Sequence, residues 1–239
     1  MLIDMHAHSA DISLCCKATL EDVLTYTKEN GMDGVVLANH YTSKYLKNET
    51  PADFARRFVA EYRRAKALGE RMDCRVFFGI EVTMERHTLE HMLVYGVDEA
   101  FPLQHPTMYS YTQAELYRAV KACGGRMVQA HPLRRGKNSL LDLSLMDGIE
   151  TNSHPLYDST HFEELAEIAR ENGLLMTAGG DFHKDTHRPK CGVYLPDHLQ
   201  STRDIMEYLA ATPRIELCVQ EPQDMQSRNV TFIKKEIAP

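Results

Sequence analysis

Short apolar runs alternate along the chain with longer stretches in which apolar residues recur at helical spacing. The short runs are β-branched or follow a glycine, which is typical of buried strands. They predict strands at residues 1–3, 34–38, 75–80, 91–95, 126–130, 148–151, 174–178 and 192–195, with shorter extended segments near 215–219 and 230–233. The longer stretches predict helices at residues 19–30, 52–68, 112–123, 162–172 and 201–211.

This regular exchange of strand and helix indicates an α/β fold with a mainly parallel sheet. The chain has 239 residues and no linker rich in glycine or serine. Because α/β barrels of about 250 residues routinely form one domain, we expect a single domain over residues 1–239. So many strand and helix pairs within one domain favour a parallel barrel over an open sheet.

Composition excludes several classes of protein. With 43% apolar and 26% charged residues, the chain resembles an ordinary globular protein. Its net charge of −7 argues against an extended nucleic-acid or anionic membrane surface. No apolar run approaches the roughly 18 residues of a membrane span, and Asp4 and His6 precede any signal-peptide core, so we expect a cytoplasmic protein. The 6 cysteines, including the adjacent Cys15 and Cys16, predict reduced thiols.

Side chains that bind metals follow the predicted strands repeatedly. They are His6, His8, His40, Glu81, His131, Asp181 and His183, while His91 opens its strand instead. The carboxyl ends of barrel strands open on one face, so these residues should meet in space. Each histidine taken singly is more often a hydrogen-bonded or surface residue than a ligand. Their joint pattern favours a metal centre, in which His6 and His8 project to the same side of an extended segment.

Two acids near these histidines have alternative roles. Glu81 ends an apolar run, and a buried carboxylate needs a cation or a donor nearby. We assign it to bridge two ions, although it could instead accept backbone hydrogen bonds in the following loop. Asp4 either orients a ligating histidine from behind or is simply the acid that ends the strand.

A short basic run follows His131. Arg134, Arg135 and Lys137 predict a clamp for a phosphate group, because guanidinium groups pair with phosphate oxygens through two hydrogen bonds. The alternative is a solvated basic loop. Residues 150–154 line the pocket or form a surface loop, and we expect most of the remaining histidines, among them His187, to face solvent.

The order of the motifs resembles the PHP family, named for polymerase and histidinol phosphatase domains. The motifs are Asp4-Met5-His6-Ala7-His8-Ser9, Asn39-His40, Gly79-Ile80-Glu81, His91, Ala130-His131-Pro132 and Gly180-Asp181-Phe182-His183. They cover about three quarters of the chain. The resemblance implies a distorted (βα)7 TIM-like barrel with two or three divalent ions, zinc, manganese or iron, at the carboxyl ends of the strands.

The resemblance also implies how the ligands divide among the ions. One ion is held by His6, His8, Glu81 and Asp181, a second by Glu81, His91 and His131, and a third by His40 and His183. Many family members complete the third site with a histidine or aspartate several residues after the His-x-His pair. Residues 11–16 of this chain, Asp-Ile-Ser-Leu-Cys-Cys, offer no clear counterpart. A thiolate from Cys15 or Cys16 is one alternative, and the centre is binuclear or trinuclear accordingly.

We therefore expect a metal-dependent phosphoesterase, similar to histidinol phosphatases, that acts on a small phosphate monoester or a short nucleotide. Two ions lower the pKa of a bridging water from 15.7 towards about 7, and the hydroxide attacks the phosphorus. Glu81 holds the ions, and His183 or His40 either protonates the leaving oxygen or binds a metal. The negative net charge and the lack of clustered aromatic residues argue against a long nucleic-acid substrate.

Two other functions use the same residues. An amidohydrolase-like enzyme would direct the hydroxide at an amide or lactone carbonyl, which leaves Arg134 and Arg135 without a role. A non-catalytic metal-binding PHP module would bind ions without turnover. Inhibition by inorganic phosphate distinguishes the first alternative, and a metal analysis with a phosphatase screen distinguishes the second.

Overall fold

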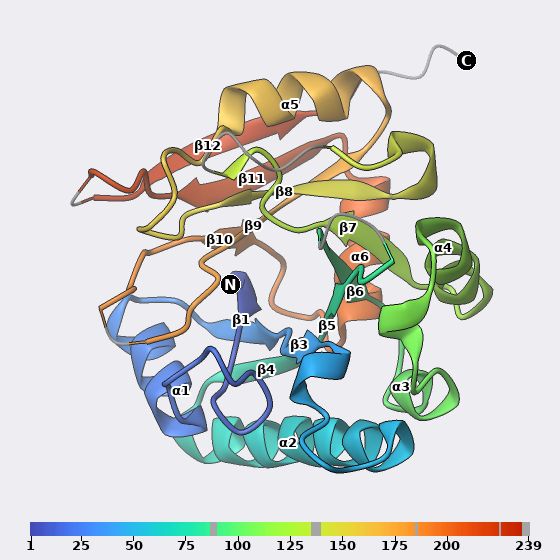
Figure 1. The fold of residues 1–239 in the computed structure, drawn as a ribbon. Helices are drawn as coiled ribbons and strands as arrows, with labels where there is room; N and C mark the ends of the chain where they lie inside the picture. Colours follow the sequence, from blue (N-terminus) through green and yellow to red (C-terminus); the bar gives the residue numbers. More distant parts are fainter. Residues whose placement is uncertain (87–89, 135–139, 185, 225, 236–239) are drawn as a thin grey trace.

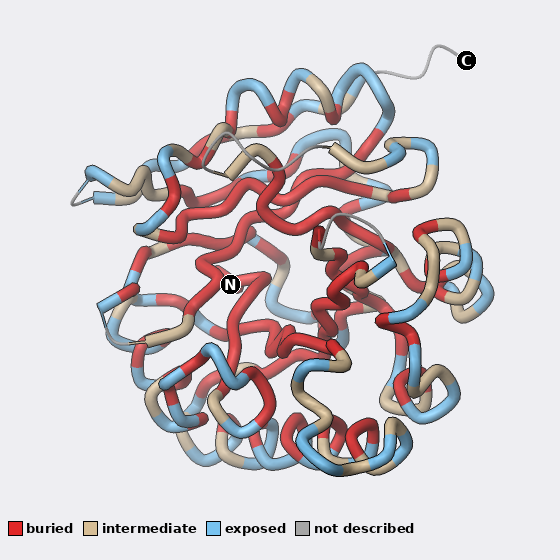
Figure 2. The backbone as a smooth tube through the Cα atoms, viewed as in Figure 1, coloured by how far each residue is buried: buried red, intermediate tan, exposed pale blue. Residues whose placement is uncertain are grey.

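The protein is built from two sheets with helices on their outer sides (Figure 1). A computed structural model describes residues 1–86, 90–134, 140–184, 186–224 and 226–235. Apolar side chains of both sheets and of the helices form one buried hydrophobic cluster. Figure 2 shows the strands largely buried and the outer surfaces of the helices exposed. The predicted α/β class is therefore confirmed.

The first sheet has six strands in the order β12-β11-β10-β1-β2-β4. Its strands are β1 (Leu2–Ala7), β2 (Gly34–Leu37), β4 (Arg75–Phe78), β10 (Gly192–Tyr194), β11 (Arg214–Val219) and β12 (Arg228–Ile233). β1, β2 and β4 are parallel, whereas β10 pairs with β1 in the antiparallel direction. The first strand of the chain, β1, therefore lies inside this sheet, between β10 and β2.

The second sheet also has six strands, in the order β3-β5-β6-β7-β8-β9. They are β3 (His40–Tyr41), β5 (Ile80–Thr83), β6 (His91–Tyr95), β7 (Arg126–Gln129), β8 (Gly148–Asn152) and β9 (Leu175–Gly179). β6 runs antiparallel to both of its neighbours, while β7, β8 and β9 are parallel.

The helices are α1 (Leu20–Glu29), α2 (Pro51–Met72), α3 (Ala100–Gln104), α4 (Gln113–Ala122), α5 (Phe162–Glu171) and α6 (Thr202–Ala211), with 3-10 turns at Ser43–Tyr45, Met108–Ser110 and Leu143–Leu145. α1 contacts β2, α2 contacts β4, α4 contacts β7, α5 contacts β8 and β9, and α6 contacts β6. Capping boxes start α1, α4 and α6, since Thr or Ser and an acid three residues later satisfy free backbone N–H groups. Within the described ranges, no helix is long and apolar enough to cross a membrane.

In the described parts of the chain, the two sheets do not close into the distorted (βα)7 TIM-like barrel that the family resemblance implied. The antiparallel strands β6 and β10 interrupt the parallel order, and the expected strand over residues 75–80 divides at Gly79 into β4 and β5. A Cβ at Gly79 would lie 2.6 Å from Val36 Cγ1, so only glycine allows the chain to pass there from one sheet to the other. The sheets meet through an isolated parallel bridge between Ala7 and Phe182.

Candidate metal centre

The strand ends of both sheets bring the predicted metal-binding side chains together. His6 lies on β1, Glu81 on β5 and His40 on β3, and Asp181 follows β9. His91 begins β6, and because β6 is antiparallel to β5, its first residue lies at the end where β5 finishes. This orientation explains why His91 opens its strand, whereas His6 lies near the carboxyl end of β1 and Asp181 follows β9.

His6, His8, Glu81 and Asp181 form the most deeply buried group of possible ligands. The Nε2 atoms of His6 and His8 are 3.0 Å apart, and both lie 3.4 Å from Glu81 Oε2. Asp181 Oδ1 lies 3.0 Å from His8 Nε2 and 3.6 Å from His6 Nε2. Four donor atoms from distant parts of the chain thus face one point.

These separations fit a shared metal ion. Nitrogen and oxygen ligands lie about 2.1 Å from zinc, so two of them are about 3.0 Å apart at a 90° angle and about 3.6 Å apart at 120°. The five distances in this group, from 3.0 to 3.6 Å, fall within that interval. The donor set therefore fits the ion that the resemblance implies.

Glu81 also faces a second set of imidazoles. Its Oε1 lies 2.8 Å from His91 Nδ1 and 3.0 Å from His131 Nε2. Its Oε2 lies 2.5 Å from His40 Nδ1, yet these two buried atoms have no partner in hydrogen-bond geometry. A carboxylate with a separate cluster of nitrogen atoms at each oxygen has the arrangement of a bridging ligand.

His183 contributes to two further groups, one with His8 and His40 and one with Asp181 and His154. The ligand atoms within each group lie within 4.8 Å of one another. His183 is the more accessible member, with 16% of its side chain exposed, whereas the side chain of Asp181 is 6% exposed. His40 and His183, which the resemblance assigned to a third ion, are therefore brought together at the open side of the cluster.

Glu150 orients the buried face of the centre. Its Oε1 and Oε2 lie 3.0 and 3.2 Å from His6 Nδ1, and Oε2 also accepts hydrogen bonds from the His131 N–H and from Asn152 Nδ2. A proton on His6 Nδ1 leaves Nε2 free to bind a metal, as in the carboxylate–histidine pairs of metalloenzymes. The sequence left open whether this segment lines the pocket, and the pattern of residues in it gave no signal for a contact with His6.

Asp4 acts on the backbone rather than on an imidazole ring. Its Oδ1 accepts hydrogen bonds from the N–H groups of His6 and Gly180, and Tyr26 donates to its Oδ2. Asp4 thus ties β1 to the segment that carries Asp181. Burial raises the pKa of Asp4 to about 7.

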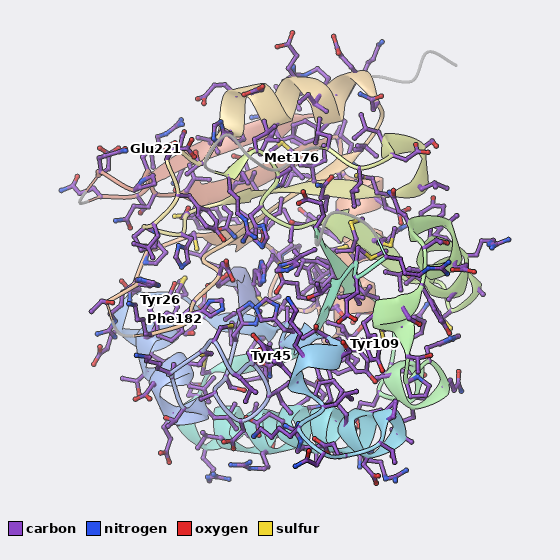
Figure 3. All side chains as sticks on the ribbon, viewed as in Figure 1. Tyr26, Tyr45, Tyr109, Met176, Phe182 and Glu221 are labelled. Atoms are coloured by element: carbon purple, nitrogen blue, oxygen red, sulfur yellow. The ribbon has the colours of Figure 1, made fainter. Side chains whose placement is uncertain are left out.

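Unusual backbone geometry orients the side chains of His131 and Asp181. His131 and Asp181 have φ angles of 30° and 49°, a region that costs a residue with a side chain about 1–3 kcal/mol. The segment after β9 is fixed by the stacking of Phe182 on Tyr26, whose ring centres are 4.1 Å apart (Figure 3). At Gly179, a Cβ would lie 2.5 Å from His6 Cβ, so glycine permits β9 to approach the metal-binding strand.

The acids and imidazoles of the cluster shift one another's pKa values in opposite directions. Burial alone would raise the pKa of Glu81, but the imidazoles of His40 and His91 lower it well below its usual value. Burial opposes charge on His6, yet the carboxylates of Glu150 and Glu81 raise the pKa of His6 well above its usual value. Burial and the neighbouring His40 hold the pKa of His8 well below its usual value. Ionised carboxylates held in a buried site favour bound cations.

The open side of the cluster carries a tyrosine and an arginine. Tyr157 donates a hydrogen bond of 2.5 Å to Asp181 Oδ2, and Arg134 NH1 donates one of 3.1 Å to the Tyr157 hydroxyl. Arg134 is therefore linked to a candidate metal ligand through a single side chain. Arg135 and Lys137, the other predicted members of the phosphate clamp, lie outside the described residues.

Two residues near this opening were not singled out from the sequence. Tyr157 lies in the loop after β8, where no hydrophobic periodicity marks its position. His187, expected in solvent, is instead buried, with its ring centre 4.4 Å from that of His154. Burial lowers the pKa of His154 to about 4, so this imidazole is neutral at physiological pH.

Comparison with known proteins identifies the fold. A two-domain protein from Bacteroides vulgatus, described as containing a predicted PHP-like metal-dependent phosphoesterase, has a TM-score of 0.67 and 17% identity. The match covers 92% of this chain but only 65% of that protein. A protein from Bifidobacterium adolescentis, described as a candidate metal-dependent phosphoesterase, has a TM-score of 0.55 and 17% identity, with 86% of this chain and 94% of that chain covered.

An amidohydrolase from Chromobacterium violaceum, solved with bound sulfate and no metal, has a TM-score of 0.57 and 16% identity. That match covers 94% of this chain and 99% of the other. No protein-family model and no curated protein sequence matches the chain. The resemblance noted from the sequence motifs is thus confirmed in three dimensions: the chain has the fold of PHP-like metal-dependent phosphoesterases.

Proposed function

We propose that this protein is a metal-dependent phosphoesterase that hydrolyses a small phosphate monoester or a short nucleotide. The main support is the position of Glu81, whose oxygens each face a different cluster of imidazole nitrogens at distances of 2.5 to 3.4 Å. Fold neighbours named as metal-dependent phosphoesterases support the same reaction class. Zinc, manganese and iron all suit this imidazole and carboxylate donor set.

The residues divide into those that hold ions and those that meet the substrate. His6, His8, Glu81 and Asp181 would hold one ion, and Glu81, His91 and His131 a second. When bound, such ions polarise the phosphoryl group and make a water molecule acidic. Glu150 would accept the proton on His6 Nδ1 and so direct Nε2 towards the ion, and Asp181 accepts a hydrogen bond from the Tyr157 hydroxyl.

Arg134 would bind the phosphate at the open side of the cluster. Its guanidinium group has hydrogen-bond donors beyond the one that reaches Tyr157, and it suits pairing with phosphate oxygens. His40 and His183, on the same side, either hold a third ion or give a proton to the leaving oxygen. The net charge of −7 favours a compact phosphorylated substrate over a nucleic-acid strand.

The test is Glu81→Ala with an aryl phosphate as substrate. We expect hydrolysis to fall to the background rate and the metal content of the purified protein to decrease, because both groups of nitrogen donors lose their shared carboxylate. Glu163→Ala, at an exposed position of α5, is the control and should keep both properties. Full activity in the Glu81 variant would contradict the proposal.

Hydrolysis of an amide or lactone is the second candidate, because one fold neighbour is named an amidohydrolase. The two reactions differ at Arg134, which a neutral substrate would not need. Competitive inhibition by inorganic phosphate that weakens in Arg134→Ala supports the phosphoesterase. Turnover of a lactone or amide without such inhibition supports the amidohydrolase, and bound metal without turnover in either screen indicates a non-catalytic module.

A further inference from the structure

A thiol lies next to the histidines on the open side of the centre. Cys15 Sγ is 3.1 Å from His183 Nε2, and the ring centre of His183 lies 5.7 Å from that of His40. Cys15 itself is exposed, so it is not part of the hydrophobic core. Tyr45, labelled in Figure 3, lies edge-on to the His40 ring with ring centres 5.9 Å apart.

The tautomer of His183 favours a ligand at its other nitrogen. His183 Nδ1 lies 2.7 Å from the backbone carbonyl oxygen of Asp181, which can only accept a hydrogen bond. Nδ1 therefore carries the proton, and in the neutral ring Nε2 presents a lone pair towards Cys15. A ring fixed in this way is typical of histidines that bind metals.

We propose that Cys15 is a thiolate ligand that completes a third metal site with His40 and His183. This proposal rests on the proposed function, since it extends the same metal centre. Zinc binds sulfur at about 2.3 Å and nitrogen at about 2.0–2.1 Å, so such ligands are about 3.1 Å apart at 90° and about 3.6 Å apart at 109°. The separation of 3.1 Å between Cys15 Sγ and His183 Nε2 agrees with the lower value.

Neighbouring residues of the same segment are engaged elsewhere. Asp11 Oδ2 accepts a hydrogen bond of 2.9 Å from Arg64. Cys16 is buried, and its Sγ donates to the carbonyl oxygens of His8 and His183 at 3.4 and 3.2 Å. Cys15 is therefore the member of residues 11–16 that combines a metal-binding side chain with a position beside the imidazoles.

The chemistry of the ligand predicts which ion the site selects. A thiolate with two imidazoles favours zinc and other thiophilic ions, whereas magnesium, calcium and manganese prefer oxygen ligands. The group of His6, His8, Glu81 and Asp181 mixes imidazole with carboxylate and is less selective. Manganese should thus fill the inner groups and leave the Cys15 position vacant, while zinc or cobalt should fill both.

The test uses cobalt, because a cobalt–thiolate bond absorbs in the near ultraviolet and needs no enzymatic activity to be seen. We expect the full chain, reduced and then titrated with Co²⁺, to develop this charge-transfer band. Cys15→Ser should lose the band and bind about one ion fewer per chain, and Cys15→His should recover the ion without the band. Cys16→Ser is the matched control and should keep both, with thermal unfolding measured for every variant.

The outcomes separate this proposal from the function on which it rests. Protein that binds cobalt but shows no charge-transfer band, or shows the same band in Cys15→Ser, overturns the role of Cys15 and leaves the phosphoesterase standing. Protein that binds no cobalt overturns both. Alkylation gives a second measure: iodoacetamide should modify Cys15 more slowly in the zinc-loaded protein than in the chelated protein, and equal rates contradict ligation.

Discussion

Glu150→Gln should lower the metal affinity more than it lowers the unfolding free energy of the metal-free protein. In the wild-type protein both carboxylate oxygens of Glu150 lie near His6 Nδ1, Oε1 at 3.0 Å and Oε2 at 3.2 Å, and Oε2 also accepts from the His131 N–H and from Asn152 Nδ2. Glutamine keeps the shape but has only one accepting oxygen. That oxygen must take either the Oε1 position, which is nearer His6, or the Oε2 position beside the two other donors, and the amide NH₂ takes the remaining position.

The free-energy costs of the two amide orientations show which one the variant adopts. If the oxygen stays on His6, two buried donors face an NH₂ group, at about 1–3 kcal/mol for each donor left unsatisfied. If the amide turns over, His6 must accept at Nδ1 and carry its proton on Nε2, where it blocks the metal. Loss of such an orienting partner typically lowers metal affinity 10- to 100-fold, about 1.4–2.7 kcal/mol. The second arrangement costs the metal-free protein less, so it should prevail.

The assay is a competitive chelator titration with zinc, together with denaturant unfolding of the metal-free protein. We expect a 10- to 100-fold weaker affinity and a change in unfolding free energy of less than about 2 kcal/mol. Glu163→Gln, on the exposed face of α5, is the control. Zinc affinity within threefold of wild type would refute the assigned contact, and so would a His6 proton on Nδ1 in NMR spectra of the variant.

Three further predictions follow from the same cluster. Tyr157→Phe removes the hydroxyl that links Arg134 to Asp181, so inhibition by inorganic phosphate should weaken about tenfold, whereas Tyr194→Phe, whose hydroxyl bonds to a surface asparagine, should leave it unchanged. Chelation should lower the melting temperature by roughly 5–10 °C, since an ion at about 100 times its Kd adds about 2.7 kcal/mol of stability; an unchanged melting curve would contradict a tightly bound ion. Asp4 has a folded pKa of about 7 against 3.8 for the free side chain, so the folded protein binds the extra proton. This proton stabilises the folded state by at most about 4 kcal/mol below pH 4, and the stabilisation is lost as the pH rises through 7. Asp4→Asn should therefore flatten the fall in unfolding free energy that the chelated protein shows between about pH 4 and pH 7.

The predicted strands were enough to place most of the candidate metal ligands near one another. His6, Glu81 and Asp181 lie at strand ends that hydrophobic runs mark clearly, and the geometry of parallel strands then gathers them. The contact of Glu150 with His6 could not be predicted this way. It depends on which face of β8 turns inward, and the sequence of this strand, Gly-Ile-Glu-Thr-Asn, does not alternate between apolar and polar residues.

The direction of strands was harder to predict than their position. β6 and β10 lie where apolar runs predicted them, but both are antiparallel to neighbouring strands. Side-chain pattern records which residues are buried and says little about the direction of the backbone hydrogen bonds. This is why the predicted closed barrel was wrong while the α/β class was right. The two-residue strand β3 was missed because a segment so short has no period.

The sequence distance between ligands has a consequence for how the protein matures. His8 Nε2 and Asp181 Oδ1 are 3.0 Å apart although 173 residues separate them along the chain. A nascent or unfolded polypeptide holds these donors far apart, so it has little affinity for the ion that the finished molecule binds. We therefore expect metal uptake to be a late step, and the metal content of a preparation should set a lower limit on the fraction of molecules that have reached the native state.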